Sequence, residues 1–152
     1  CVLLFAGVVV VSSAMQIAGS MKNPEITSVQ REQAAYLQNN GLTFGYATFW
    51  NANVVTELTD GDVEAVAVSI DANAQGQGVP HTSMWLEATA DRRMERPDEP
   101  VFLMLTAQES GQLSDFLALS GAQKRWEQSG MTIYEIESQR VFFETAQTMD
   151  AQ

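Results

Sequence analysis

The sequence predicts an α/β fold in which helices flank a small mixed or mostly parallel β-sheet. Short apolar runs typical of strands alternate with segments whose apolar residues recur every three to four positions, as on one face of a helix. Glycine and proline clusters separate these segments. A third observation adds a membrane element, because no charged residue occurs before Lys22. The sheet is therefore expected to be preceded by the end of a transmembrane helix.

Residues 1–21, CVLLFAGVVVVSSAMQIAGSM, form an uncharged apolar lead. As a helix, this run would be roughly 30 Å long, about the hydrocarbon thickness of a bilayer. The favoured interpretation is the end of a transmembrane helix. The alternatives are a signal-peptide remnant, a lipoprotein acylated at Cys1, and a buried segment of a soluble protein. They are less favoured because no basic region precedes the run, no polar tether follows Cys1, and a domain of this size could hardly bury the run on all sides.

Residues 22–152 have the length and composition of one globular domain. The whole chain has a net charge of −11, from 8 basic and 19 acidic residues. This charge repels nucleic acid and anionic lipid headgroups, so neither is expected as a partner. The flanks of membrane helices that collect Lys and Arg are cytoplasmic, and here few basic residues follow the lead. We therefore expect the domain on the extracytoplasmic side of the cell membrane.

The first part of the domain is predicted to be a polar helix over residues 25–40, ended by the pair Asn40–Gly41. An aromatic stretch follows, and its spacing is helical from Tyr46 to Leu58. Before that helix, alternation places three residues on one face of a short extended segment: Leu42, Phe44 and Tyr46.

The rest of the domain alternates between strand and helix patterns, and Val101 to Thr106 is apolar enough to be a central strand covered on both faces. This order is typical of a Rossmann-like layered sheet. The predicted elements are a strand over residues 63–71, a loop over 73–80, a helix over 81–93, a strand over 101–106, a helix over 110–121 and a hairpin over 124–138 centred on Ser129–Gly130.

Metal and cofactor chemistry have little support in the sequence. Cys1 and His81 are the single cysteine and histidine of the chain. An intrachain disulfide is therefore excluded, and a zinc site would have to rely on carboxylates. Gly76 and Gly78 partly match a dinucleotide-binding loop, but Pro80 offers no N–H to a phosphate, so a plain loop is favoured. His81 is either a general base or an ordinary polar residue, and the second interpretation is favoured. We predict no catalytic residue, no metal and no cofactor.

Two groups of residues are candidates for binding a substrate. The first is the aromatic stretch, where Tyr46, Trp50, Asn51 and Asn53 supply the aromatic faces and amides that suit sugars. Its spacing equally fits the packed face of a helix. The second is a cluster of cations, Arg92, Arg93 and Arg96, which would suit a phosphate or a carboxylate. A solvated, self-neutralising loop is the favoured alternative there.

A longer pattern runs through residues 41–68. A Gly-Tyr-Ala-x-x-Trp stretch is followed by a Thr-x-Leu-Thr-x-Gly turn and a strand, and the tail contains MWLEATADRR, VFLMLT and MTIYEIES. The pattern resembles the soluble C-terminal extracytoplasmic domain of bacterial polytopic membrane proteins of the C-type glycosyltransferase kind. The resemblance covers most of residues 41–138 and rests on these positions: Gly45, Tyr46, Ala47, Trp50, Thr56, Leu58, Thr59 and Gly61.

The resemblance implies an accessory domain that is not itself catalytic. In such enzymes the catalytic carboxylates are expected in a loop near the start of the membrane part, and nothing here matches that loop. The domain would belong to a glycosyltransferase-like protein of cell-envelope glycan assembly. Its partners would be the membrane part of the same polypeptide and a glycan or lipid-linked sugar. The alternatives are a structural or interaction module without a ligand, and a soluble α/β enzyme that uses the loop from Gly76 to His81.

Overall fold

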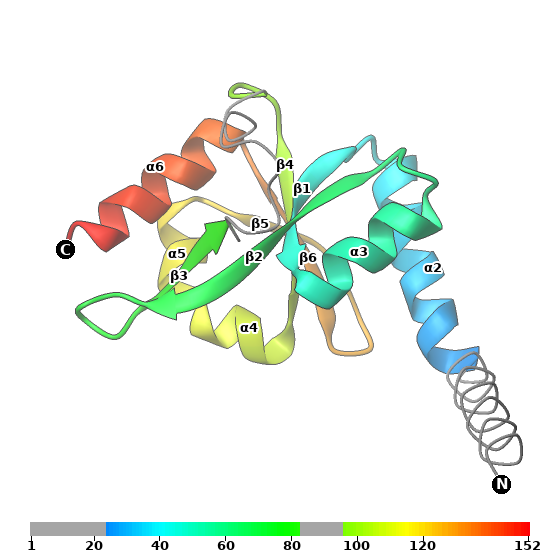
Figure 1. Ribbon diagram of the computed structural model, residues 1–152, viewed down its shortest axis with the longest axis horizontal. Helices are drawn as coiled ribbons and strands as arrows, with labels where there is room; N and C mark the ends of the chain where they lie inside the picture. The colour runs from blue at the N-terminus through cyan, green and yellow to red at the C-terminus, as the bar shows by residue number, and fades with distance from the viewer. Residues whose placement is uncertain (1–23, 83–95) are drawn as a thin grey trace, which may run out of the picture.

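The structure is a computed structural model, and it describes residues 24–82 and 96–152. A mixed six-stranded sheet carries helices on both faces, which confirms the predicted α/β class (Figure 1). The elements are α2 (Pro24–Asn39), β1 (Phe44–Thr48), α3 (Phe49–Leu58), β2 (Glu64–Ala72), β3 (Gly78–Thr82), β4 (Val101–Thr106), α4 (Ala107–Gln112), α5 (Ser114–Leu119), β5 (Gln123–Gln128), β6 (Met131–Ile136) and α6 (Gln139–Asp150).

The apolar lead lies outside the described residues. Within the two described ranges, every helix is too short or too polar to cross a bilayer. The predicted transmembrane helix therefore remains a prediction.

The strand order across the sheet is β3-β2-β1-β4-β6-β5. The three central strands are parallel, with β1 paired to β2 on one side and to β4 on the other. The outer pairs, β2 with β3, β4 with β6 and β5 with β6, are antiparallel. Of the two predicted alternatives, a mixed or a mostly parallel sheet, the structure shows the mixed sheet. Strand β4 is the buried inner strand that its apolar sequence indicates.

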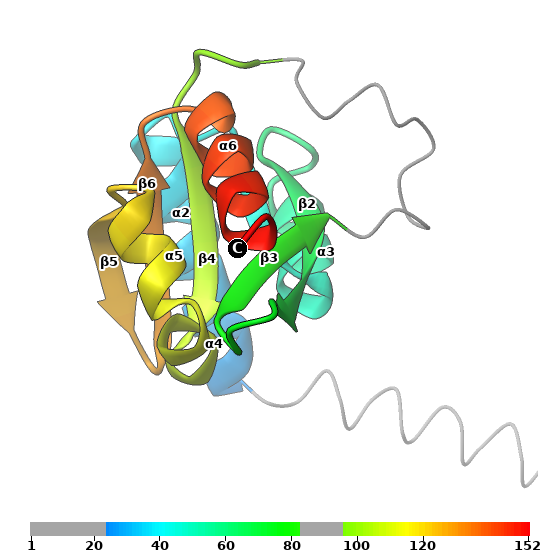
Figure 2. The same ribbon diagram turned by 90° about the vertical axis from the view of Figure 1, so that its left-hand side faces the viewer.

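Two apolar layers hold the helices to the sheet. Figure 2 shows α5 and α6 on the side nearer the viewer and α2 and α3 on the far side. The near layer contains Tyr46, Leu103, Phe116 and Phe142. The far layer contains residues from both helices and from the opposite faces of the same strands: Leu37, Leu42, Ala47, Ala52, Val55, Val63, Phe102, Met104 and Ile133.

The aromatic stretch folds differently from its predicted pattern. Tyr46 lies in the middle of β1, and α3 begins three residues later at Phe49. Tyr46 and Phe44 share the α6 side, whereas Leu42 packs on the α2 side. Helical spacing fails here because the backbone of β1 is paired on both sides, and this pairing outweighs local preference.

Both predicted turns at glycine are found. Gly41 ends α2 with a φ of +69°. Ser129 and Gly130 have φ values of +51° and +79°, as a tight two-residue hairpin with a right-handed twist requires.

Two elements were not predicted. Strand β3 occupies Gly78–Thr82, which was assigned to a loop and to the start of a helix; most of that predicted helix lies outside the described residues. Helix α6 begins at Gln139, after the N-cap residue Ser138, whose hydroxyl accepts a hydrogen bond from the Val141 N–H at 3.3 Å. Its buried side, Phe142, Ala146 and Met149, has clear helical spacing.

Gly45→Ala should strongly destabilise the domain. A Cβ atom at this position would collide with the carbonyl oxygen and the ring of Phe102 on β4. We expect a loss of about 1–3 kcal/mol or more in the free energy of unfolding, measured by chemical denaturation. Gly111→Ala is the matched control, because it meets open space within α4 and should be neutral or stabilising. Equal effects of the two substitutions would contradict the proposed close approach.

Candidate functional site

A pocket lies where the central strands end. In an open α/β sheet, ligands bind beyond the carboxyl ends of the strands, where neighbouring connections diverge. Here β1 leads into α3 and on to β2, while β4 lies on the other side of β1. Asn51 is in the first turn of α3, and Met131 of β6 pairs with Thr106, the last residue of β4. Both residues line the pocket, which therefore opens at this edge.

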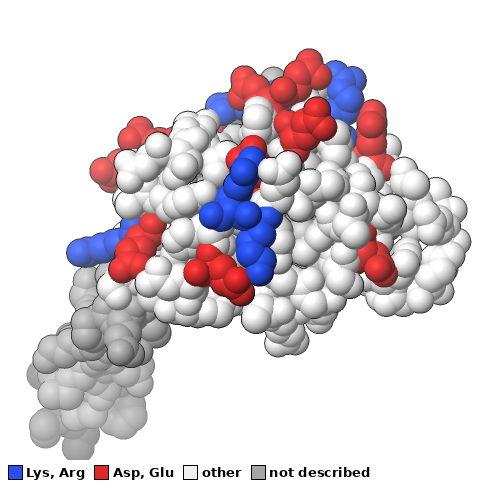
Figure 3. Space-filling view, turned by 180° about the vertical axis from the view of Figure 1, so that it is seen from behind, with Lys and Arg blue, Asp and Glu red and all other residues white. Residues whose placement is uncertain are grey.

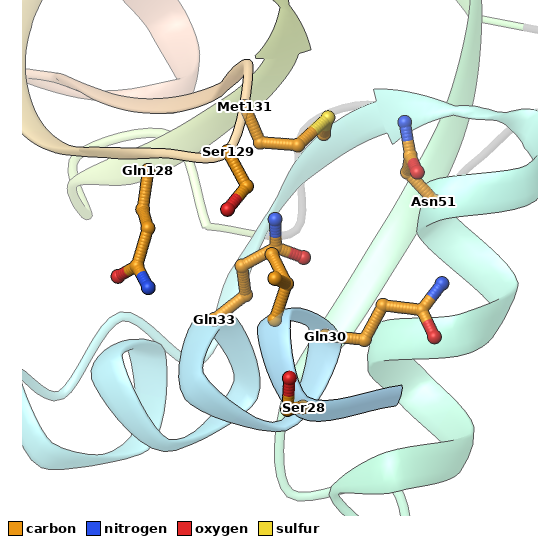
Figure 4. Close-up of a pocket in the computed structure, with 8 residues that line it drawn as sticks. Ser28, Gln30, Gln33, Asn51, Gln128, Ser129 and Met131 are labelled. Atoms are coloured by element: carbon orange, nitrogen blue, oxygen red, sulfur yellow. The ribbon is translucent and has the colours of Figure 1, made fainter. Parts of the chain in front are cut away.

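The pocket has a volume of about 580 Å³, within the usual range for small-molecule sites. Three elements build it: the N-terminal half of α2, the start of α3 and the tip of the β5–β6 hairpin (Figure 4). Its lining residues are Ser28, Val29, Gln30, Gln33, Asn51, Gln128, Ser129 and Met131.

The lining is polar but uncharged. Four carboxamides and two hydroxyls are joined by two apolar side chains, Val29 and Met131. Carboxamides and hydroxyls both donate and accept hydrogen bonds. Among the described lining residues, none carries a carboxylate, an amine, a guanidinium, an imidazole or a thiol. The arrangement suits recognition of a neutral polar molecule better than proton transfer or metal binding.

Gln33 is the most unusual residue of the pocket. Its side chain is 2% exposed, yet no protein group accepts a hydrogen bond from its Nε2. Figure 4 shows the amide extending from α2 toward Ser129 and Met131 of the hairpin. An unpaired buried amide donor costs about 1–3 kcal/mol. A ligand oxygen would offset that cost.

Asn51 is positioned by its own helix. Its Nδ2 donates to Thr48 Oγ1 at 3.2 Å, which fixes the carboxamide against the N-cap residue of α3. Because Thr48 makes no side-chain cap bond, it leaves the first-turn backbone N–H groups uncapped. Asn51 is thus one predicted substrate-binding residue that the structure places in a pocket.

The other residues of the aromatic group have separate surroundings. Tyr46 is 1% exposed, stacks on Phe142 with ring centroids 4.0 Å apart, and accepts a hydrogen bond from Gln139 Nε2 at 3.1 Å. It serves the core and offers no surface to a ligand. Trp50 is 78% exposed beside Phe49, and Asn53 donates to the Phe49 carbonyl on the outside of α3. Trp50 thus lies beside Asn51 in sequence and keeps a free aromatic face.

The predicted arginine group does not join this site. Arg92 and Arg93 lie outside the described residues. The Cζ atom of Arg96 lies 5.4 Å from the centre of the ring of Phe44, the first residue of β1. The Nη1 atom of Arg96 is 3.8 Å from Glu99 Oε2. The pocket is at the other end of β1, so Arg96 and Asn51 lie near opposite ends of this strand.

The loop from Gly76 to His81 is part of a β-hairpin. Gly76, with a φ of +80°, lies in the turn between β2 and β3, and His81 lies within β3. His81 Nε2 is 3.5 Å from Asp150 Oδ1 of α6, beside a cavity of about 290 Å³. The sequence did not indicate this partner. In the described part of the chain, no group of three His, Cys, Asp or Glu side chains could hold a metal ion.

The described basic side chains mostly neutralise carboxylates. Figure 3 shows basic groups beside acidic ones, with broad uncharged surface between them. Arg125 Nε is 3.1 Å from Glu135, and Lys124 Nζ is 2.8 Å from Glu127. The hydrogen bond and charge of Glu127 raise the pKa of Lys124. Such exposed pairs add little stability, but they leave no concentrated basic patch on that face.

Comparisons with known proteins give no relatives: no family model, curated protein or solved structure matches this chain.

Most residues of the pocket were missed by reasoning from the sequence. Gln33 could have been recognised from the sequence, because it occupies the apolar face of α2, four positions after Val29 and four before Leu37. Gln128 and Ser129 left none, since their contribution depends on the hairpin tip reaching α2.

Gln33→Met should leave the domain as stable as before, or slightly more stable. The substitution keeps the length of the side chain and removes an unpaired buried donor. The matched control is Gln139→Met, at a glutamine that is 1% exposed. Gln139 donates to Tyr46 Oη at 3.1 Å and accepts from the Arg96 N–H at 3.0 Å. Its loss should cost about 1–3 kcal/mol in chemical denaturation. A similar cost at both positions would show that Gln33 is paired within the fold.

Trp50→Ala should change the free energy of unfolding by less than about 0.5 kcal/mol, because the side chain is 78% exposed. Tyr46→Ala, made in the same stretch, should cost about 3–5 kcal/mol because it empties a core position. Thermal and chemical unfolding of both variants distinguishes a surface residue from a core residue. A large loss at Trp50 would favour the purely structural interpretation of the aromatic stretch.

Proposed function

We propose that this chain is the extracytoplasmic accessory domain of a polytopic membrane protein and that its amide-lined pocket binds a neutral carbohydrate. The parent would be a glycosyltransferase-like enzyme of cell-envelope glycan assembly. The domain would hold the glycan or lipid-linked sugar near the membrane part and would not catalyse the reaction itself.

The observation that carries the binding proposal is the uncharged polar lining of the pocket. Sugar hydroxyls both donate and accept, and the four carboxamides and two hydroxyls of the lining can do the same. An anionic ligand would find no cation among the lining residues that the structure describes. A purely apolar ligand would leave the amides without partners, at a cost for each.

The aromatic side chain next to Asn51 supports the same class of ligand. Trp50 is exposed at the start of α3, and indole rings supply flat apolar surface that suits the C–H face of a sugar ring. Trp50 is not one of the residues lining the pocket, so it would serve a part of the glycan that extends beyond it.

The position of the pocket on α2 supports a role near a membrane. Ser28 and Val29 belong to the first turns of α2 and follow the uncharged lead, residues 1–21, closely in sequence. Even a fully extended chain of seven residues spans at most about 25 Å. If the lead spans a bilayer, the pocket lies close to the lipid headgroups, where a lipid-linked sugar would be presented.

Asn51→Ala should weaken the binding of neutral oligosaccharides by about twofold to tenfold, the loss expected for one hydrogen bond. The measurement is an NMR titration of the purified chain, kept in a detergent without a sugar headgroup. The matched control is Asn53→Ala on the same helix, because Asn53 is exposed and bonded to its own backbone. Absence of oligosaccharide binding, or equal losses in both variants, would contradict the proposed pocket.

The membrane placement has a separate test. An antibody against residues 22–152 should detect a band in the membrane fraction several times heavier than 16.7 kDa, cut by protease added from outside. A band near 17 kDa in the soluble fraction would overturn the membrane placement. The carbohydrate pocket would then be tested by the oligosaccharide titration alone.

A further inference from the structure

We infer that the pocket is built for an acetamido group, so that its ligand is an N-acetylated sugar. This inference rests on the proposed carbohydrate pocket and narrows the class of sugar. Three features of the lining support it: a buried donor without a protein acceptor, apolar side chains near that donor, and the absence of charge.

The buried donor sets the first requirement. Gln33 lines the pocket with its side chain 2% exposed, and its Nε2 has no protein acceptor. The ligand group that reaches it must bring an acceptor oxygen. A carbonyl oxygen meets this requirement with two lone pairs, and no hydrogen of its own competes with the amide hydrogens.

The apolar neighbours set the second requirement. Val29 precedes Gln33 by one helical turn on α2, and Met131 lies on the hairpin toward which the Gln33 amide extends (Figure 4). A bare hydroxyl would gain nothing from these side chains. The methyl group of an acetamide would gain about 0.8 kcal/mol or more by leaving water. An acetamide places its carbonyl and its methyl on the same carbon, so it meets both requirements at once.

The absence of charge excludes close competitors. A uronic acid or a sugar phosphate would need a cation or several strong donors to replace its water. The described lining residues include no cation, and the chain as a whole is strongly acidic. The remaining lining amides and the hydroxyls of Ser28 and Ser129 suit the ring hydroxyls of the same sugar.

The control glutamine strengthens the argument. Gln139 is equally buried, and both ends of its carboxamide bond to protein groups. The fold can therefore pair a buried glutamine completely where its role is structural. Gln33 lines the pocket and keeps a buried donor without a protein acceptor.

The test compares two trisaccharides that differ in one substituent per ring: the β-1,4 trimer of N-acetylglucosamine and the β-1,4 trimer of glucose. We expect the acetamido trimer to bind the chain at least about tenfold more tightly in the NMR titration. Its addition should also move the side-chain NH₂ signal of Gln33, which is assigned by its disappearance in Gln33→Met. The preference should vanish in Gln33→Met, whose thermal unfolding verifies that the variant is folded.

The other outcomes separate the two proposals. Equal binding of both trimers, weakened by Asn51→Ala, would overturn the acetamido inference and leave the carbohydrate pocket standing. No binding of either trimer would overturn both. Tighter binding of an N-acetylated tripeptide than of either sugar would also overturn both, because the pocket would then recognise a peptide.

Discussion

The close approach of β4 to β1 is the contact on which the rest of the structure depends. Gly45 has no side chain, and the ring and carbonyl of Phe102 lie against its backbone. This approach allows β1 to pair in parallel with β4 on one side while it pairs with β2 on the other. Because β1 is central, it supplies both layers, with Tyr46 packed under α6 and Ala47 under α2 and α3.

The same constraint creates the site. With β1 between two parallel neighbours, its chain must leave the sheet through α3, and α3 begins at Phe49 next to the end of β4. The β5–β6 hairpin pairs with β4 and reaches the same edge. Helix α2 covers this end of the central strands from one side. Its side chains line the pocket together with side chains of α3 and the hairpin, and the described lining residues are uncharged.

Much of the fold could be predicted from the sequence, because its signals are local. The apolar run from Val101 to Thr106 became the inner strand β4, and the Ser129–Gly130 pair became the tight turn of the hairpin. The sequence places Tyr46 where a short extended segment meets a helical spacing, and pairing of β1 with two neighbours puts it in the strand. Strand β3 contains Pro80, which weakens any strand signal, and it is tolerated because β3 is an edge strand.

The candidate site was harder to predict from the sequence, because three segments that lie far apart in the chain build it. Asn51 could be proposed because sugars suit amides beside aromatic residues, and it does line the pocket. Asn53, two residues later, is not one of the lining residues and bonds to its own helix. The sequence predicts both Arg96 and Asn51 as contacts, yet they lie at opposite ends of β1. This separation is known only once the position of β1 in the sheet is known. Spacing along a sequence cannot supply that information.

The apolar face of α2 connects the site to the first part of the chain. Val29, Gln33 and Leu37 share one side of this helix, and the middle position of that stripe is a buried glutamine without an acceptor. A leucine or methionine there would extend the apolar layer without the cost of an unpaired donor, about 1–3 kcal/mol out of the roughly 5–15 kcal/mol that stabilise a domain. Gln33 thus lies on the helix that follows the apolar lead in the sequence. Under the proposed function, a bound ligand would supply the missing acceptor and offset the cost of the unpaired amide.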